Sequence, residues 1–125
     1  MIPLDTSFLI RALARGSAED RRLRNWLAGA KPLSISAIAW AEFLCGPLAP
    51  DAVDLAARVA GEQVSFTSED AAVAAHLFNI SGRRRGTLVD CMVAATAIRA
   101  NAELATADVA DFRRFVKAGL RLVGE

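Results

Sequence analysis

The chain is predicted to form a three-layer α/β fold, in which a parallel sheet is covered by helices on both faces. Short apolar runs alternate with longer segments of helical periodicity over all 125 residues. Strands that alternate with helices through short links usually form parallel sheets. Apolar residues make up 54% of the chain, which is enough to cover both faces of such a sheet. We expect a single domain spanning residues 1–125, because no linker, repeat or low-complexity tract interrupts the pattern.

Short apolar runs are predicted to be the strands. They are Ile2–Leu4, Leu33–Ile35, Gln63–Phe66, Glu103–Thr106 and Arg121–Val123. In a sheet of parallel strands covered by helices, ligands bind beyond the carboxyl ends of the strands. Polar residues that directly follow these runs are therefore the first candidates for function.

Helices are predicted to fill the intervals between the runs. Ser17 and Thr67 each precede acidic residues in a pattern that resembles a capping box, so each begins a helix. The first of these helices ends near Gly29, and Gly82 stops the second. Two further helices are expected from Asp51 to Gly61 and from about Leu88 to Asn101.

Four carboxylates stand where predicted strands end or where helices lie: Asp5, Glu42, Asp90 and Asp108. Groups so far apart in the sequence converge only through folding, at one edge of a sheet. Their mutual repulsion there favours the binding of divalent cations. The sequence therefore predicts a pocket that binds divalent cations, in which Asp111 is an alternative to Asp108 as the fourth acid.

Helix capping is the alternative role for three of these acids. Asp5 and Asp108 each stand where an N-cap residue would, and Asp111 is placed to complete a capping box with Asp108. Asp90 is placed to serve Thr87 in the same way. Each acid taken alone fits a cap better than a metal ligand.

Glu42 does not fit the capping explanation. It lies inside the run from Ala37 to Cys45, too far from the expected cap at Ser36, and nearly all its neighbours are apolar. A carboxylate held against an apolar surface needs a proton, a cation or a basic partner. No lysine or arginine lies within a helical turn of it, so the remaining alternative to a metal is a distant arginine.

Basic residues are clustered although the net charge is only +1. The clusters are Arg21–Arg22, Arg83–Arg84–Arg85 and Arg113–Arg114. A basic rim around a metal-loaded acidic pocket suits a polyanionic substrate, and Arg83, Arg84 and Arg85 lie shortly before Asp90, where they are candidates for phosphate contacts. Ordinary solvated surface explains the same clusters equally well.

Other residue types exclude several kinds of site. One histidine, His76, and two cysteines, Cys45 and Cys91, which we expect to be buried, are too few for a typical zinc site. No apolar run is long enough to span a membrane, and the first residues lack the pattern of a secretory signal. We therefore expect no membrane association and a cytoplasmic location.

The acids occur in motifs that resemble those of one family. Leu4-Asp5-Thr6-Ser7, the segment from Ser36 to Glu42, Asp90 at the head of an alanine-rich helix, and Thr106-Ala107-Asp108 resemble, in order, the four motifs of PIN-domain ribonucleases. The similarity is strongest to the VapC-type toxins of bacterial toxin–antitoxin pairs and spans almost the whole chain. The segment Arg83 to Val89 departs from the more common approach to the third acid.

The resemblance implies a metal-dependent endoribonuclease. It implies that Asp5, Asp90 and Asp108 hold Mg²⁺ or Mn²⁺ and that Glu42 orients a water or completes the site. Ser7 and Thr106 lie beside the acids, where their hydroxyls are expected to bond a carboxylate or a substrate phosphate, although Ser7 is also placed to cap the following helix. The implied partners are RNA, a cognate antitoxin protein and a second copy of the chain.

Two other kinds of protein remain as alternatives. One is an aspartate-based phosphoryl-transfer domain, for which Asp5 would be the nucleophile, but position 7 holds Ser instead of the second Asp of that motif. The other is a non-catalytic domain of the same fold that binds RNA or a partner. The presence of all four acids favours an enzyme over this binding module.

Overall fold

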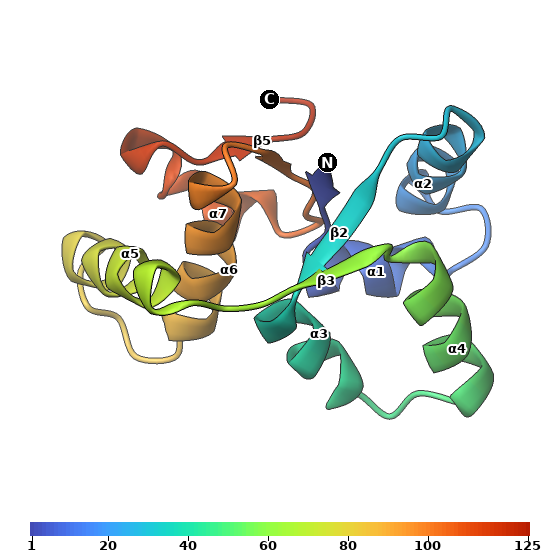
Figure 1. Cartoon of the computed structure of the whole chain (residues 1–125), viewed down its shortest axis with the longest axis horizontal. Helices are drawn as coiled ribbons and strands as arrows, with labels where there is room; N and C mark the ends of the chain where they lie inside the picture. The colour runs from blue at the N-terminus through green and yellow to red at the C-terminus, as the bar shows by residue number, and fades with distance from the viewer.

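The computed structural model describes residues 1–125 and has the predicted α/β architecture (Figure 1). The strands are β1 (Ile2–Pro3), β2 (Leu33–Ser36), β3 (Glu62–Val64), β4 (Glu103–Leu104) and β5 (Arg121–Leu122). The α-helices are α1 (Thr6–Ala12), α2 (Ala18–Ala28), α3 (Ala37–Leu44), α4 (Pro50–Val59), α5 (Ser68–Ile80), α6 (Leu88–Arg99) and α7 (Val109–Arg113), and η1 (Val116–Ala118) is a 3-10 helix. No helix combines the length and the apolar character that a membrane span requires.

All strand pairs are parallel. β2 lies between β1 and β3, and β4 pairs with β5. A parallel bridge between Leu4 and Ala105 joins these two groups. The Asp5 N–H donates to the Ala105 carbonyl at 2.8 Å, and the Ala105 N–H donates to the Pro3 carbonyl at 2.9 Å. The resulting order is β3-β2-β1-β4-β5, with the carboxyl ends of all strands at one edge.

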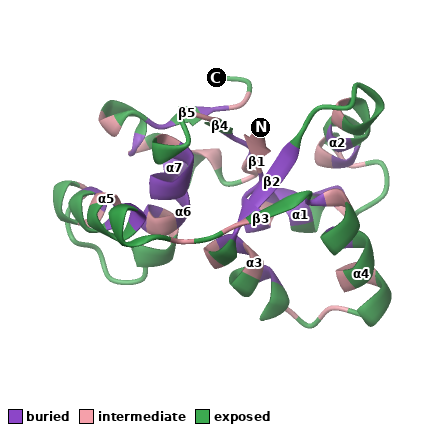
Figure 2. Cartoon of the chain, in the orientation of Figure 1, coloured by how far each residue is buried: buried purple, intermediate pink, exposed green.

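Helices flank the strands on both sides. Figure 1 shows α5 and α6 on one side of β2 and β3, and α2 and α4 on the other. Figure 2 shows that burial is greatest in β2 and along α6. Leu4, Ile35 and Leu104 from the central strands are at most 1% exposed and pack in the same core as Phe8 and Phe43. The predicted fold class is confirmed.

The observed bounds of all five strands differ from the predicted ones, by one residue at an end of β1, β2 and β5 and by more at β3 and β4. β3 begins at Glu62 and ends at Val64, because its only partner, β2, ends at Ser36, where α3 begins. β4 pairs with β5 at Glu103 and Leu104, and the ladder ends after the single bridge of Ala105 to Leu4. Thr106 lies beyond it and uses its hydroxyl in side-chain hydrogen bonds. Strand length here depends on the partner strand rather than on local composition.

Helix starts follow the predicted capping with one difference. Thr67 and Asp70 form a complete capping box at the start of α5. Ser17 caps α2 by accepting from the Asp20 N–H at 2.9 Å, but the Asp20 carboxylate accepts from the Gly16 N–H instead of from Ser17. The box at α2 is therefore shifted by one residue.

Two small residues illustrate what the sequence alone did not show. Gly61 has φ +71°, and a Cβ at this position would overlap the carbonyl oxygen of Leu33, so β3 can begin beside β2 only with glycine here. Cys91 is buried as predicted, but Cys45 is exposed at the C-cap of α3. The prediction for Cys45 was wrong because the apolar run ends there on the solvent side of the helix.

Candidate active site

The four acids singled out from the sequence line one pocket. Asp5 lies between Leu4, which follows β1, and the start of α1. Glu42 lies on α3, Asp90 is the third residue of α6, and Asp108 directly precedes α7. The pocket has a volume of about 260 Å³ and is also lined by Thr6, Ser7 and Ile10. Parallel strands bring the residues that follow them to one edge of the sheet, which explains how Asp5 and Asp108 meet.

Hydrogen bonds fix the carboxylate of Asp5. The Ser7 hydroxyl donates to Asp5 Oδ2 at 2.7 Å, and the Thr106 hydroxyl donates to the same oxygen at 2.8 Å. The two hydroxyl oxygens are 3.1 Å apart. The Ala107 N–H donates to Ser7 Oγ and the Asp108 N–H donates to Thr106 Oγ1, both at 3.0 Å. The network orients Asp5 and connects α1 to the segment after β4.

Asp5 is nearly inaccessible to solvent, with only 3% of its surface exposed. Burial raises the pKa of its carboxyl group above the usual value. Hydrogen bonds from Ser7 and Thr106 oppose this effect, and the charge of Asp108 adds to it. The ionised form of Asp5 therefore lacks full compensation in the protein alone.

Asp90 experiences the same conflict more strongly. Burial and the charge of Asp5 raise the pKa of Asp90 to about 6, and the charges of Glu42 and Asp111 add to the rise. Arg114 opposes it. Because Asp108 lines the pocket and Asp111 does not, Asp108 is the better candidate for the fourth acid.

Capping does not account for these side chains. Asp5 and Asp108 occupy the N-cap positions of α1 and α7, but neither side chain accepts a capping hydrogen bond. Asp90 lies within α6, where Thr87 is the N-cap residue and no side-chain cap forms. Ser7 lies inside α1 and does not cap it. The capping alternatives are therefore wrong for all four residues.

Glu42 differs from its predicted environment. Its apolar neighbours suggested a carboxylate held against an apolar surface, but α3 turns Ala39 and Phe43 into the core and leaves Glu42 exposed. No basic side chain forms an ion pair with Glu42. It therefore faces solvent at the pocket without a partner, and neither an apolar surface nor a distant arginine holds it.

Thr6 is a residue of the site that sequence reasoning missed. Its hydroxyl donates to the Ala39 carbonyl at 2.9 Å, in a buried contact that fastens the start of α1 to α3. This bond sets the position of Asp5 relative to Glu42. In the sequence, Thr6 appeared only as part of the motif Leu4-Asp5-Thr6-Ser7, which gives no sign of a partner on another helix.

Arg114 was named only within the basic cluster Arg113–Arg114, and the structure places it beside Asp90. Its Nη2 lies 3.4 Å from Asp90 Oδ2, and its guanidinium carbon lies 4.7 Å from the centre of the Phe115 ring. Its Nε is buried without a hydrogen-bond partner. A pair of this length compensates the charge of Asp90 only in part. The contact joins residues 24 positions apart, so no local signal pointed to it.

The predicted phosphate contacts at Arg83, Arg84 and Arg85 are not part of the acidic pocket. All three are exposed in the loop between α5 and α6, and Arg83 has φ +54°. The Arg84 carbonyl accepts a hydrogen bond from the Thr87 hydroxyl at 2.7 Å, which shapes the loop before α6. The structure leaves these side chains in solvent and does not bring them to the four acids.

The donor set fits a hard divalent cation. Every acidic group of the pocket offers carboxylate oxygens, and a bound cation would offset the burial and mutual repulsion that raise the pKa values of Asp5 and Asp90. No three of the acids are close enough to form a ready cage around one ion. Mg²⁺ usually keeps several waters and takes only one or two carboxylates, so such a cage is not required.

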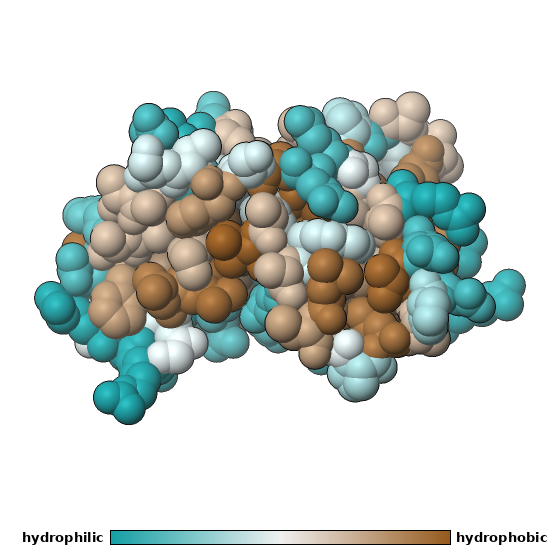
Figure 3. All heavy atoms as spheres, turned by 60° about the horizontal axis from the view of Figure 1, so that its bottom comes forward, coloured by the Kyte–Doolittle hydropathy of each residue, from teal (hydrophilic) through white to brown (hydrophobic).

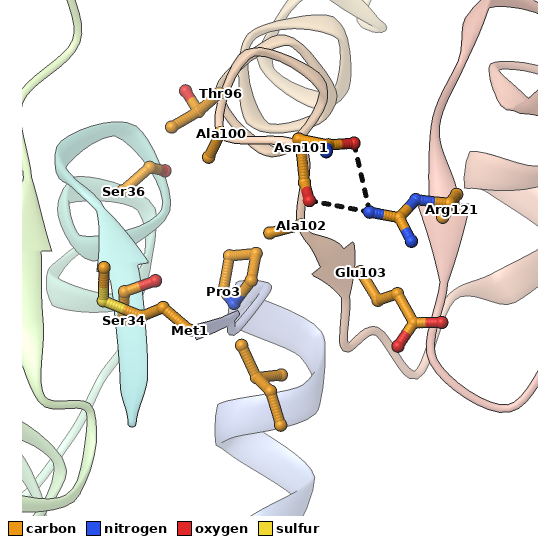
Figure 4. A pocket seen from close by; sticks show the side chains of 11 residues that line it. Met1, Pro3, Ser34, Ser36, Thr96, Ala100, Asn101, Ala102, Glu103 and Arg121 are labelled. Carbon is orange, nitrogen blue, oxygen red and sulfur yellow. Dashed lines mark hydrogen bonds between the residues drawn. The ribbon is translucent and has the colours of Figure 1, made fainter. Parts of the chain in front are cut away.

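A different pocket lies beside the amino ends of β1, β4 and β5 and the end of α6 (Figure 4). It has a volume of about 330 Å³ and contains one carboxylate, Glu103. Its arginine, Arg121, is occupied by the carbonyl and side-chain oxygens of Asn101, at 2.6 and 3.2 Å. This pocket lacks a group of reactive side chains, so the smaller acidic pocket is the better candidate for chemistry.

Comparison with known proteins agrees with the fold. The model of the PIN domain family matches residues 2–118. No curated protein matches the sequence. VapBC2 from Rickettsia felis, solved with a promoter DNA fragment, is a similar structure, with 23% identity, a TM-score of 0.75 and coverage of 98% of this chain and 97% of that one.

Two further solved structures show the same fold. VapBC from Salmonella typhimurium, bound to DNA, has 19% identity and a TM-score of 0.73, with 97% of this chain and 95% of that chain covered. The toxin VapC20 of Mycobacterium tuberculosis, described as cleaving the sarcin-ricin loop, has 20% identity and a TM-score of 0.69, with 98% of each chain covered. These likenesses concern the fold alone.

Proposed function

Because the chain belongs to the PIN-domain family, we propose that it is an endoribonuclease and the toxin of a toxin–antitoxin pair, using Mg²⁺ or Mn²⁺ to hydrolyse RNA phosphodiester bonds. The observation that carries the proposal is the meeting of Asp5, Glu42, Asp90 and Asp108 in one pocket at the carboxyl edge of the sheet. A cluster of ionised acids repels a polyanion unless cations reverse the local charge. RNA cleavage here therefore needs a metal.

Asp5, Asp90 and Asp108 would hold the cation, directly or through water. When bound, it supplies stabilisation of negative charge on the phosphate and makes water a better nucleophile near pH 7. The hydroxyls of Ser7 and Thr106 keep the Asp5 carboxylate in place during the reaction. Their orienting role matters because small displacements of catalytic groups reduce rates strongly.

Glu42 would act on the attacking water. It is exposed at the pocket and free of ion pairs, so its carboxylate can accept a hydrogen bond from that water and orient it towards phosphorus. In the hydrolysis, the water oxygen forms a bond to phosphorus and gives up a proton to the solvent, the bond from phosphorus to the leaving oxygen breaks, and the leaving oxygen takes up a proton from the solvent. Histidine is not required, and His76 is exposed on α5, outside the pocket.

Cleavage of total RNA and transfer RNA by the purified chain tests this function. The protein is freed of any co-purifying partner and assayed in Mg²⁺, Mn²⁺ and EDTA beside Asp90→Asn. Asp54→Asn, which removes an exposed carboxylate of α4, is the matched control. We expect metal-dependent cleavage by the parent and the control only. Cleavage by Asp90→Asn at the parent rate would contradict the assigned site, and a folded parent that binds RNA without cutting it would favour a non-catalytic module.

The proposed antitoxin partner has a suitable surface. A groove of about 450 Å³ lies between the helices α1, α2 and α4 and is lined mainly by apolar side chains, including Leu13, Leu23, Leu27, Leu55 and Val59. Leu27 and Leu55 are 45% and 44% exposed and lie together in this groove, so they form part of a contiguous apolar surface. We propose that an apolar segment of the antitoxin binds here. Several of the structural neighbours were solved as toxin–antitoxin complexes, which supports such a partner.

The proposed second copy of the chain would use another apolar surface. Figure 3 shows two groups of hydrophobic side chains, one on each half of one face of the molecule. One of these groups lies on the side where α5 and α6 are found. A small apolar pocket of about 200 Å³ lies between these helices and includes Phe66, Leu88 and Met92. Leu88 is 48% exposed and Ile80 is 56% exposed. We propose that homodimers form through α5 and α6, which measurement of the molar mass in solution would test.

A further inference from the structure

A separate cleft contains two arginines and lies beside the acidic pocket. It has a volume of about 290 Å³ and lies between α1, α2 and the segment that follows β4. Arg11 and Arg22 line it, and Glu19 is its only acid. The remaining lining side chains are small or apolar, apart from Thr106. The cleft therefore has a net positive lining, in contrast to the acidic pocket.

The cleft and the acidic pocket are adjacent. Thr106 lines the cleft, while its hydroxyl donates to Asp5 at 2.8 Å and lies 3.1 Å from the Ser7 hydroxyl. Arg11 follows Ser7 by four residues on α1, which places the two side chains on one face of the helix, about 6 Å apart along its axis. A strand whose phosphate occupies the acidic pocket can therefore continue past Thr106 into the cleft.

The two arginines are not engaged within the protein. Arg24, Arg99, Arg113 and Arg114 form ion pairs with carboxylates. Arg11 and Arg22 form none, and neither side chain makes a hydrogen bond, although Glu19 shares their cleft. A free guanidinium presents a fork of donors that matches the oxygens of a phosphate. Two such groups in one cleft are suited to a polyanionic strand.

We propose that this cleft binds the phosphodiester backbone of the RNA strand on one side of the cleaved bond, through Arg11 and Arg22. The inference rests on the proposed function, since it extends the substrate of the acidic pocket by a neighbouring subsite. It replaces the expected phosphate contacts at Arg83, Arg84 and Arg85, which line no pocket. Contacts of this kind position the strand and do not read its sequence.

Binding of a short fluorescent single-stranded RNA to Asp90→Asn protein tests the proposal without cleavage. In this background, Arg11→Gln and Arg22→Gln are compared with Arg58→Gln, an exposed arginine of α4 that lines none of the pockets and forms no ion pair. We expect each cleft variant to bind about 5- to 10-fold more weakly and the double variant more weakly still, because each loses a charge-assisted contact. Arg58→Gln should bind as the background does.

Salt dependence provides a second readout that a general loss of charge would not change in the same way. Between about 50 and 200 mM salt, the plot of the logarithm of the association constant against the logarithm of the salt concentration has a negative slope. This slope should become shallower by about 0.7 for each cleft arginine removed, and should be unchanged in Arg58→Gln. Affinities and slopes that remain equal in all variants would overturn the proposal. A further variant replaces Arg83, Arg84 and Arg85 with glutamine. Loss of RNA affinity in this variant alone would also overturn the proposal, as would a complete absence of RNA binding at low salt.

Cleavage by the parent chain separates this inference from the proposed function. If the parent cleaves RNA while the cleft variants bind as tightly as the background, the cleft proposal fails and the nuclease proposal stands. If the parent does not cleave while binding falls in Arg11→Gln and Arg22→Gln, the nuclease proposal fails and the cleft remains a strand-binding site. In an active parent, the same two substitutions should raise KM more than they lower kcat.

Discussion

Asp90→Asn is expected to stabilise the metal-free protein near neutral pH while it removes a proposed metal ligand. The pKa of Asp90 is raised to about 6, mainly by burial and by the charge of Asp5. Folding at pH 7 therefore requires an ionised carboxylate in a place that favours the protonated form. Asparagine has a similar shape and no charge, so it removes this cost.

The size of the effect follows from the difference between about 6 and the usual value of 3.8. Each pKa unit corresponds to about 1.4 kcal/mol, which gives an upper limit of about 3 kcal/mol. The Asp90 side chain is 31% exposed, so solvent screening reduces this figure, and the variant also loses its pair with Arg114. We expect a net gain of about 1 to 2 kcal/mol in the free energy of unfolding at pH 7.

The pH dependence gives the sign of the effect. Between pH 3.8 and 6 the folded parent binds more protons at Asp90 than the unfolded chain, so its free energy of unfolding falls as the pH rises through this range. The variant lacks this term. The two proteins should therefore have similar stability at pH 3.8 and below, and should diverge up to about pH 7.

Urea unfolding followed by tryptophan fluorescence in EDTA measures these free energies, since Trp26 stacks on Phe8 with ring centres 5.4 Å apart. Asp54→Asn is the control and should differ from the parent by less than about 0.5 kcal/mol at every pH. Added Mg²⁺ should stabilise the parent and not Asp90→Asn. If Asp90→Asn is less stable than the parent at pH 7 in EDTA, the acids are not in electrostatic conflict and the reasoning is wrong.

Three further predictions concern the rest of the molecule. Burial raises the pKa of Asp70, but the hydrogen bonds from Thr67 and Arg99 outweigh this effect and bring the pKa below 3.8. Asp70→Asn should therefore lower the free energy of unfolding by about 1 to 2 kcal/mol at pH 7, as measured by urea unfolding. That deficit should shrink as the pH falls below 3.8, and a deficit independent of pH would contradict the assigned cause. Gly61→Ala should lower the free energy of unfolding by about 1 to 3 kcal/mol and therefore lower the thermal midpoint. An unchanged midpoint would show that the contact with β2 is dispensable. Leu55→Glu should abolish co-purification of a co-expressed antitoxin while RNA cleavage is retained, whereas an intact complex would place the partner elsewhere.

Much of the fold was predictable because its signals are local. The alternation of apolar runs and helical segments predicted the strands and most helices, and the capping residues Ser17 and Thr67 predicted two helix starts. Strand ends were less predictable, since β3 stops where its neighbour β2 gives way to α3. The length of a strand depends on a partner strand that is far away in the sequence, so the residues of the strand alone do not predict where it ends.

The same distinction applies to the site. The four acids were identifiable because each follows a predicted strand or lies on a predicted helix, and the structure places them in one pocket. The exposure of Glu42 was not, because an apolar run suggests burial on every side while a helix turns only one face inward. The pairing of Arg114 with Asp90 depends on how α7 packs near α6, which no pattern in either segment reveals.

The acids of the pocket differ in their freedom to move, and this difference bears on how a cation would bind. Asp5 is held by two hydroxyls and by the bridge between β1 and β4, so it is fixed before any ion arrives. Glu42 and Asp108 are exposed, and Asp90 has only a long pair with Arg114 at 3.4 Å. A cation can therefore anchor on a rigid carboxylate while its other ligands adjust at little cost in ordered structure. Because ion binding also removes the repulsion that destabilises the metal-free protein, its free energy should appear directly as added stability, and a titration of unfolding against Mg²⁺ should report the affinity of the site without any substrate.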